Sequence, residues 1–105
     1  MNYKNQIQDY IALEMETLKK LDVDSIDLAM NLIMKAYENK KKIYIFGNGG
    51  SSATASHFQN DFNKGISEYV DTKFNFTCLN DNVATLMAIA NDIGFEEVFR
   101  FQLKN

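Results

Sequence analysis

The sequence predicts an α/β protein in which parallel strands alternate with helices. Two short apolar segments rich in β-branched and aromatic residues, 43–46 and 74–79, are typical of buried strands. Helical patterns precede the first segment, separate the two and follow the second. This α-α-β-α-β-α-α order implies right-handed crossovers between parallel strands. Because two strands make a poor parallel sheet, we expect the 105 residues to be the N-terminal half of a larger domain, completed by another stretch of chain or a partner.

Two helices are expected before the first strand. Residues 3–21 and the residues after Asp24-Ser25, which we interpret as an N-cap, place apolar side chains at helical spacing. These side chains are Ile7, Ile11, Met15, Leu18 and Leu21 in the first helix, and Ile26, Ala29, Met30, Ile33 and Tyr37 in the second. The lysines at 40–42 are predicted to be a solvated helix end.

Between and after the strands the pattern predicts further helices. One is expected over 51–63, followed by a mostly polar loop over 65–72. Another begins at Asn80-Asp81 and is interrupted by Asn91-Asp92-Ile93-Gly94, a pattern typical of a C-capping turn. A last helix is expected from about Phe95.

Composition narrows the class of protein. A hydrophobic content of 46% is enough for a packed core, and a net charge of −3 with a pI near 5.0 argues against a nucleic-acid partner. No segment has the length needed to span a membrane, and the first residues do not form a signal peptide. Cys78 is the only cysteine, which predicts a core thiol in a reducing, cytoplasmic setting.

The segment Phe46-Gly47-Asn48-Gly49-Gly50-Ser51-Ser52 is the most informative part of the chain. A strand, a glycine-rich turn and a helix start together form a site suited to an anion. Ser52 occupies the position that a dinucleotide fingerprint or a phosphate loop would give to glycine, so neither motif is present. The hydroxyl and amide groups suit a compact sugar phosphate. The alternative is a tight connection in which the glycines serve backbone geometry alone.

His57, the only histidine, lies one helical turn before Asp61. With Gly50 and Thr54 it is expected to line one side of the helix, while Ala55, Phe58 and Phe62 face the core. The spacing suits an acid/base pair or two ligands of a zinc-like metal. The alternative is a surface ion pair worth well under ~1 kcal/mol.

Two separated motifs resemble the phosphoheptose isomerases, the sedoheptulose 7-phosphate isomerases of the sugar-isomerase (SIS) family. They are Gly47-Asn48-Gly49-Gly50-Ser51 with Ala53, Ala55, His57 and Phe58, and, after Leu79, the segment Asn91-Asp92-Ile93-Gly94-Phe95-Glu96-Glu97-Val98-Phe99. The resemblance implies a flavodoxin-like, three-layer αβα SIS fold with a parallel sheet, preceded by a helical hairpin. Residues 1–105 would be the N-terminal part of one SIS domain, with 1–40 for oligomerisation and 43–105 starting the αβα core.

The activity implied by the resemblance is conversion of sedoheptulose 7-phosphate to D-glycero-D-manno-heptose 7-phosphate, toward the heptose of lipopolysaccharide or capsule. Family members act as homotetramers and move a proton through an enediol. Substrate binding is implied for Asn48, Gly49, Gly50, Ser51, Asn91 and Asp92. His57 and Asp61 are implied as the catalytic pair and as ligands of one zinc ion.

Two departures from the family pattern bear on activity. Asp61 stands where the family has glutamate, which shortens the arm by one methylene, or ~1.5 Å. The family's hydroxyl-rich phosphate loop and its later glutamine and histidine lie beyond Asn105. The alternatives to an isomerase are therefore a non-catalytic SIS-type binding or regulatory protein, or a truncated remnant without independent function.

Overall fold

The computed structural model describes all residues from Met1 to Asn105. They form two compact units, Met1–Leu32 and Ile33–Asn105, and the second helix contributes residues to both. The helical hairpin and the functional division into 1–40 and 43–105 stay predictions.

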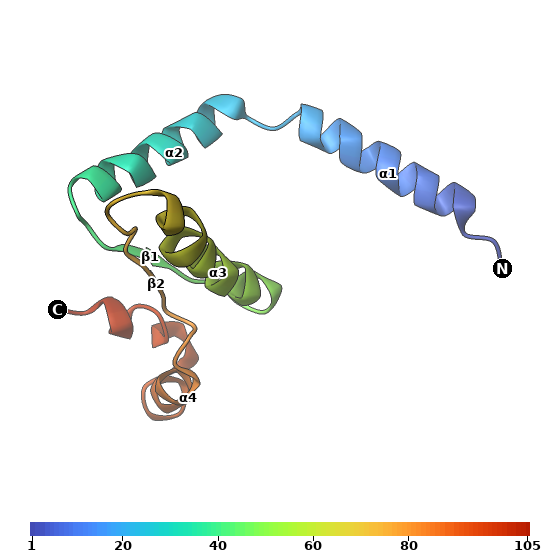
Figure 1. Cartoon of the computed structure of the whole chain (residues 1–105). Coiled ribbons are helices and arrows are strands. Elements are labelled where there is room, and N and C mark those ends of the chain that lie inside the picture. Colours follow the sequence, from blue (N-terminus) through green and yellow to red (C-terminus); the bar gives the residue numbers. More distant parts are fainter. The chain divides into compact units, whose positions relative to one another are not determined.

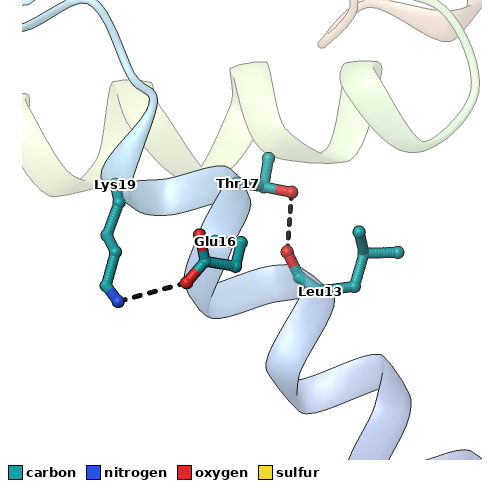
Figure 2. Close-up of polar contacts among 4 residues, drawn as sticks. All are labelled: Leu13, Glu16, Thr17 and Lys19. Carbon is teal, nitrogen blue, oxygen red and sulfur yellow. Dashed lines mark hydrogen bonds and ion pairs between the residues drawn. The ribbon is translucent and has the colours of Figure 1, made fainter.

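The first unit consists of helical residues without a core of their own. Helix α1 spans Lys4–Lys19 and α2 spans Val23–Glu38, and neither helix has a fully buried side chain. The polar contacts of α1 join residues of neighbouring turns. Lys19 Nζ lies 3.2 Å from Glu16 Oε1, and the Thr17 hydroxyl donates to the Leu13 carbonyl at 2.8 Å (Figure 2). Exposed pairs of this kind contribute little stability. No helix of the chain is both long and apolar enough to cross a lipid bilayer.

The N-cap of α2 lies earlier than the sequence pattern indicated. Asp22, not Asp24 or Ser25, caps the helix, because its carboxylate accepts the Ser25 backbone N–H at 3.2 Å and the Ser25 hydroxyl at 2.6 Å. These hydrogen bonds hold the pKa of Asp22 below its usual value. Either aspartate fits the capping preference, so the two were not distinguishable from residue type.

The second unit is built on two parallel strands, as the element order predicted. Strands β1 (Ile43–Ile45) and β2 (Phe76–Cys78) pair with Ile43 opposite Phe76 and Ile45 opposite Cys78. Both are shorter than the apolar segments, but the hydrogen bonds extend further. Ile43 donates to the Asn75 carbonyl at 2.8 Å and Leu79 to the Ile45 carbonyl at 3.0 Å.

Helix α3 (Gly50–Asn60) packs against both strands (Figure 1). It continues directly into a π turn at Asp61–Gly65 and a 3₁₀ turn at Ile66–Tyr69. The prediction of a loop from residue 65 is therefore wrong for its first half. Gly65 keeps right-handed helical dihedral angles, and without a proline nothing forces the chain out of them.

Aromatic side chains form the centre of the second unit. Phe62 stacks on Phe76 with ring centroids 4.4 Å apart and meets Phe74 edge-on at 5.1 Å. Tyr37, near the end of α2, stacks on Phe74 at 4.2 Å and donates its hydroxyl to the Thr72 carbonyl. The buried apolar residues are Ala55, Phe74, Phe76, Cys78, Leu79, Ile89 and Val98. The predicted core position of Cys78 is thus confirmed.

Helix α4 spans Val83–Asp92 and starts later than Asn80-Asp81. Asn82 caps it by accepting the Thr85 N–H at 3.1 Å. Its end confirms the predicted capping turn, since Gly94 donates its N–H to the Ile89 carbonyl at 2.9 Å.

The continuous last helix expected from Phe95 is replaced by two 3₁₀ turns, Phe95–Glu97 and Phe101–Leu103. The amide of Gln102 donates to the Val98 carbonyl within this segment and to the Leu79 carbonyl, and the second hydrogen bond ties the segment to the end of β2.

The buried thiol predicts a pH dependence of stability. Burial raises the pKa of Cys78 above its ordinary value of about 8.5. The folded protein therefore keeps a proton that the unfolded chain loses. Its stabilising contribution is complete below the unfolded-state pKa and is lost as the pH rises through the folded-state pKa.

We expect the free energy of unfolding to fall more steeply between about pH 8 and pH 10 in the wild type than in Cys78→Ala. Urea titrations at several pH values measure both slopes, and tyrosine and lysine titration is common to the two proteins. Equal slopes would contradict the prediction.

Candidate functional site

The glycine loop lies at the carboxyl end of β1, and its backbone requires glycine at two positions. A Cβ on Gly47 would lie 2.7 Å from the Ser51 backbone, too close for any side chain. Gly49 has φ +56°, a conformation that L-residues rarely adopt. Helix α3 then begins at Gly50 without a side-chain cap. The N–H groups of Ser51 and Ser52 donate to the Asn48 and Gly49 carbonyls at 3.0 Å, so in this first turn the Gly50 N–H remains available to an anion.

Asn80, which the sequence analysis did not single out as a site residue, holds this loop in place. Its Oδ1 accepts the Gly47 N–H at 3.0 Å and its Nδ2 donates to the Gly47 carbonyl at 2.8 Å. The side-chain amide thus continues the pairing of β1 with β2 beyond the strands. The sequence could have indicated this role. Asn80 directly follows the second strand, and the carboxyl ends of neighbouring parallel strands meet at one edge of the sheet.

A cavity of about 300 Å³ opens beside the loop. Its polar end is formed by the loop, Ser52 and Asn80, while α4 and the segment after it supply an apolar wall. The lining residues are Gly47, Asn48, Gly49, Ser52, Asn80, Leu86, Met87, Ala90, Phe95, Val98 and Phe99. A concave, mostly apolar site with a few convergent polar groups is typical of small-molecule binding.

His57 and Asp61 form the contact that their spacing predicted. Nε2 of His57 lies 3.1 Å from Oδ1 of Asp61, and the two side chains are 73% and 56% exposed. Together with Thr54 they line a separate pocket of about 440 Å³, which confirms the shared face for these three residues; Gly50 does not line it. Ala55 is buried as expected, whereas Phe58 is 38% exposed and lines this pocket.

The loop and the ionisable pair line different pockets, so these residues do not form one enclosed site. Gly50 and Ser51 belong to the first turn of α3 and line neither pocket. Asn91 and Asp92 lie at the exposed end of α4, where the Asn91 amide donates to the Asp92 carboxylate at 2.9 Å. They also line neither pocket, and their role in substrate binding stays a prediction.

The residues present do not make a zinc site by themselves. No group of three or more histidine, cysteine, aspartate or glutamate side chains is placed to hold a metal. Zinc takes at least three protein ligands, and His57 with Asp61 supplies two. The zinc prediction therefore needs ligands from outside these 105 residues.

The Asn80 bridge leads to a stability prediction. Asn80→Leu keeps the side-chain size but leaves the partly buried Gly47 N–H and carbonyl without partners. We expect a loss of about 1–3 kcal/mol in the free energy of unfolding. Urea denaturation measures this loss, and amide exchange at Gly47 should accelerate. Asn60→Leu, at an exposed position of α3, is the matched control. An equal effect in both variants would contradict the proposed bridge.

Comparisons with known proteins agree with this arrangement. The SIS domain family model matches residues 3–104. The phosphoheptose isomerase of Helicobacter pylori is 36% identical over 81 residues, which are 77% of this chain and 42% of that protein. The phosphoheptose isomerase of Geotalea uraniireducens is 34% identical over 90 residues, covering 86% of this chain and 47% of that protein. The chain spans about half the length of these curated relatives.

Solved structures show the same likeness in three dimensions. Phosphoheptose isomerase GmhA from Neisseria gonorrhoeae superposes with a TM-score of 0.77 at 28% identity, over 97% of this chain and 53% of that one. A phosphoheptose isomerase from Francisella tularensis gives 0.82 at 27% identity, over 98% and 55%. The predicted SIS fold is confirmed. The chain therefore belongs to the SIS domain family, and its relatives within that family include phosphoheptose isomerases.

Proposed function

We propose that this chain is the N-terminal part of a phosphosugar isomerase that converts sedoheptulose 7-phosphate to D-glycero-D-manno-heptose 7-phosphate. The observation that carries the proposal is an uncapped helix start at a glycine loop, followed two turns later by a contacting His57–Asp61 pair. The similarity to phosphoheptose isomerases supports it. The product would supply heptose for lipopolysaccharide or capsule.

In the proposed reaction the ketose becomes an aldose by proton transfer between neighbouring carbons. Asp61 takes a proton from C1, which gives an enediol, and returns a proton to C2. The hydroxyl proton of O1 is lost as the aldehyde forms, while O2 gains one, so the reaction needs no further reactant. His57, 3.1 Å from Asp61, orients the carboxylate and exchanges the hydroxyl protons.

Binding of the substrate is proposed for the glycine loop. Backbone N–H groups at Asn48, Gly49 and Gly50, with the Ser51 hydroxyl, would receive the phosphate or sugar hydroxyls at the positive end of α3. Zinc, held by His57 and Asp61 with ligands from outside this chain, would polarise the substrate carbonyl.

We also propose a homo-oligomer, a tetramer in the family pattern, assembled through residues 1–40. Five apolar side chains form a stripe along α1 and the turn after it, and each is about half exposed. Exposed apolar stripes of this kind mark interaction surfaces. The five side chains are Ile7, Ile11, Met15, Leu18 and Leu21. A cytoplasmic location is proposed with it, because the one cysteine is a free, buried thiol.

The second candidate function is binding of a sugar phosphate without turnover. It is favoured by the separation of the loop cavity from the His57–Asp61 pocket and by the short arm of Asp61. A substrate bound in the cavity would then have no base within ~2.6–3.2 Å of its C1 proton.

Replacing Asp61 by glutamate distinguishes the two candidates. We expect Asp61→Glu to raise the turnover of sedoheptulose 7-phosphate by on the order of tenfold, and Asp61→Asn to abolish it, because proton transfer depends on the reach of a carboxylate. A coupled assay for the aldose measures both. Asp71→Glu, at an exposed position, is the control. Tight binding of the sugar phosphate without turnover in any form would support the binding protein instead.

Zinc binding provides a test that does not need turnover. With two donors, the 105-residue chain should retain much less than one zinc ion after dialysis, and His57→Gln should remove what remains. Metal analysis by mass spectrometry gives the stoichiometry. One tightly held zinc ion per chain would show that the chain itself holds further ligands.

A further inference from the structure

Lysines gather at the amino-terminal edge of the sheet, the edge opposite the glycine loop. Three of them fill the connection from α2 to β1, and a fourth, Lys73, lies shortly before β2. The two strands are parallel, so the segments that precede them meet at one edge. A pocket of about 160 Å³ lies there, which we call the lysine pocket. It is lined by Tyr37, Lys40, Lys41, Thr72, Lys73 and Asn75.

The two segments that form the lysine pocket are fixed against each other. The Tyr37 hydroxyl donates to the Thr72 carbonyl at 2.8 Å, and the Tyr37 ring stacks on the buried Phe74 with ring centroids 4.2 Å apart. On the other side the Ile43 N–H donates to the Asn75 carbonyl at 2.8 Å. The lysines are therefore held near one another before any ligand binds, which lowers the entropy cost of binding.

The positive charge of the lysine pocket has no partner within the chain. None of the chain's four ion pairs includes Lys40, Lys41 or Lys73. Lys42 differs, because its Nζ lies 5.8 Å from the centroid of the Tyr44 ring. The protein as a whole carries a net charge of −3, so a group of unpaired lysines runs against its overall charge. Cations held together without a carboxylate repel one another, and a bound anion removes this repulsion.

Capping of α2 does not account for these lysines. Lysine side chains near a helix end can hydrogen-bond its last carbonyls, but here backbone groups already do so. The Lys41 N–H donates to the Ala36 carbonyl at 2.8 Å. The Lys40 N–H donates to the Tyr37 carbonyl at 3.0 Å, which completes a Schellman motif. Lys73 does not belong to α2 at all, yet it lines the same pocket.

Lys40 occupies a position of this motif at which glycine is usual. Its φ of +54° lies in the left-handed region, which costs any residue with a side chain some stability. A glycine there would be less strained, but it would remove one of the three cations from the pocket. The position therefore separates stability from charge, and the experiment below makes use of this.

The size and the polar groups of the lysine pocket indicate the ligand. Pockets for drug-sized ligands measure ~300–1,000 Å³, so this one suits a single small group. The carbonyls of Thr72 and Asn75 are used by other residues, which leaves the hydroxyl and the side-chain amide facing the pocket for a ligand. Three cations with these neutral donors match a phosphate group, which has about two negative charges and several acceptor oxygens.

We propose that the lysine pocket binds a phosphate group, held by Lys40, Lys41 and Lys73 together with Thr72 and Asn75. This site is separate from the glycine loop, because the two lie at opposite ends of the strands. It does not depend on the proposed isomerase function.

Titration of the isotope-labelled 105-residue chain with sodium phosphate, followed by NMR, tests the proposal. At about pH 8 phosphate groups are largely dianions. We expect the amide signals of Thr72, Lys73 and Asn75 to move and to saturate. Sodium chloride at the same ionic strength should not move them, and equal movement with chloride would overturn the proposal.

Two substitutions test the role of the lysines. We expect Lys73→Gln to weaken phosphate binding about fivefold. Lys20→Gln makes the same change of charge at an exposed position of the first unit and should leave the affinity unchanged. Lys40→Gly should also weaken binding about fivefold while raising the urea concentration at the midpoint of unfolding, so its weaker binding could not result from unfolding. Unchanged affinity in both pocket variants would overturn the proposal.

The same spectra separate this inference from the proposed function, since Gly49 and Gly50 report on the loop. Movement confined to their signals would overturn the inference and support the proposed substrate site. Saturating movement at the lysine pocket with a silent loop would support the inference and count against that substrate site. Glycerol 3-phosphate, titrated in parallel, shows the source of the phosphate. Tighter binding than that of inorganic phosphate would identify a phosphate carried on a larger molecule.

Discussion

The second unit depends on one constraint: the backbone N–H and carbonyl groups of its two-stranded parallel sheet need hydrogen-bond partners. Buried peptide groups without partners are costly, and two strands of this length satisfy only the groups that face one another. Side-chain amides supply partners beyond the strand ends and along the outer edge of β2. Asn80 extends the pairing past the carboxyl end of β1, and Asn63 and Gln59 cover the outer edge of β2. Amides suit this task because one group both donates and accepts, as a peptide does.

The same hydrogen bonds place the candidate site. The bridge from Asn80 fixes Gly47, and the tight turn that follows directs the start of α3 toward the carboxyl edge of the sheet. Hydrogen bonds from the side chains of Gln59, Asn63 and Ser67 to the backbone of β2 and of Phe74 just before it fix the far part of that helical segment. One helix is therefore held at both ends, with its first turn at the loop cavity and His57 with Asp61 on its outer side.

Local patterns predicted much of this from sequence. The parallel strands, the glycine loop, the His57–Asp61 contact and the capping turn at Gly94 each follow from residue types a few positions apart. The Asn80 bridge and the hydrogen bonds of Gln59 and Asn63 to β2 join residues many positions apart, so they depend on a strand register that the sequence alone does not supply. The continuation of the helix past Gly65 was missed for the same reason, since the hydrogen bonds of Asn63 and Ser67 outweigh the low helix propensity of glycine.

The two edges of the sheet differ in a way that bears on how the site is completed. At β2 the outward-facing backbone N–H groups donate to side chains of this chain. At β1 the N–H and carbonyl of Tyr44 point away from β2, and no side chain of this chain forms a hydrogen bond with them. Another strand could therefore form hydrogen bonds with the outer edge of β1, whereas the outer edge of β2 is already occupied by side chains. The matched SIS structures contain nearly as much chain again. A strand added along β1 would end beside the glycine loop, because carboxyl ends of parallel strands meet at one edge. Side chains at the end of such a strand would lie near the loop cavity and the His57–Asp61 pocket, where they would be placed to join these two pockets into one site.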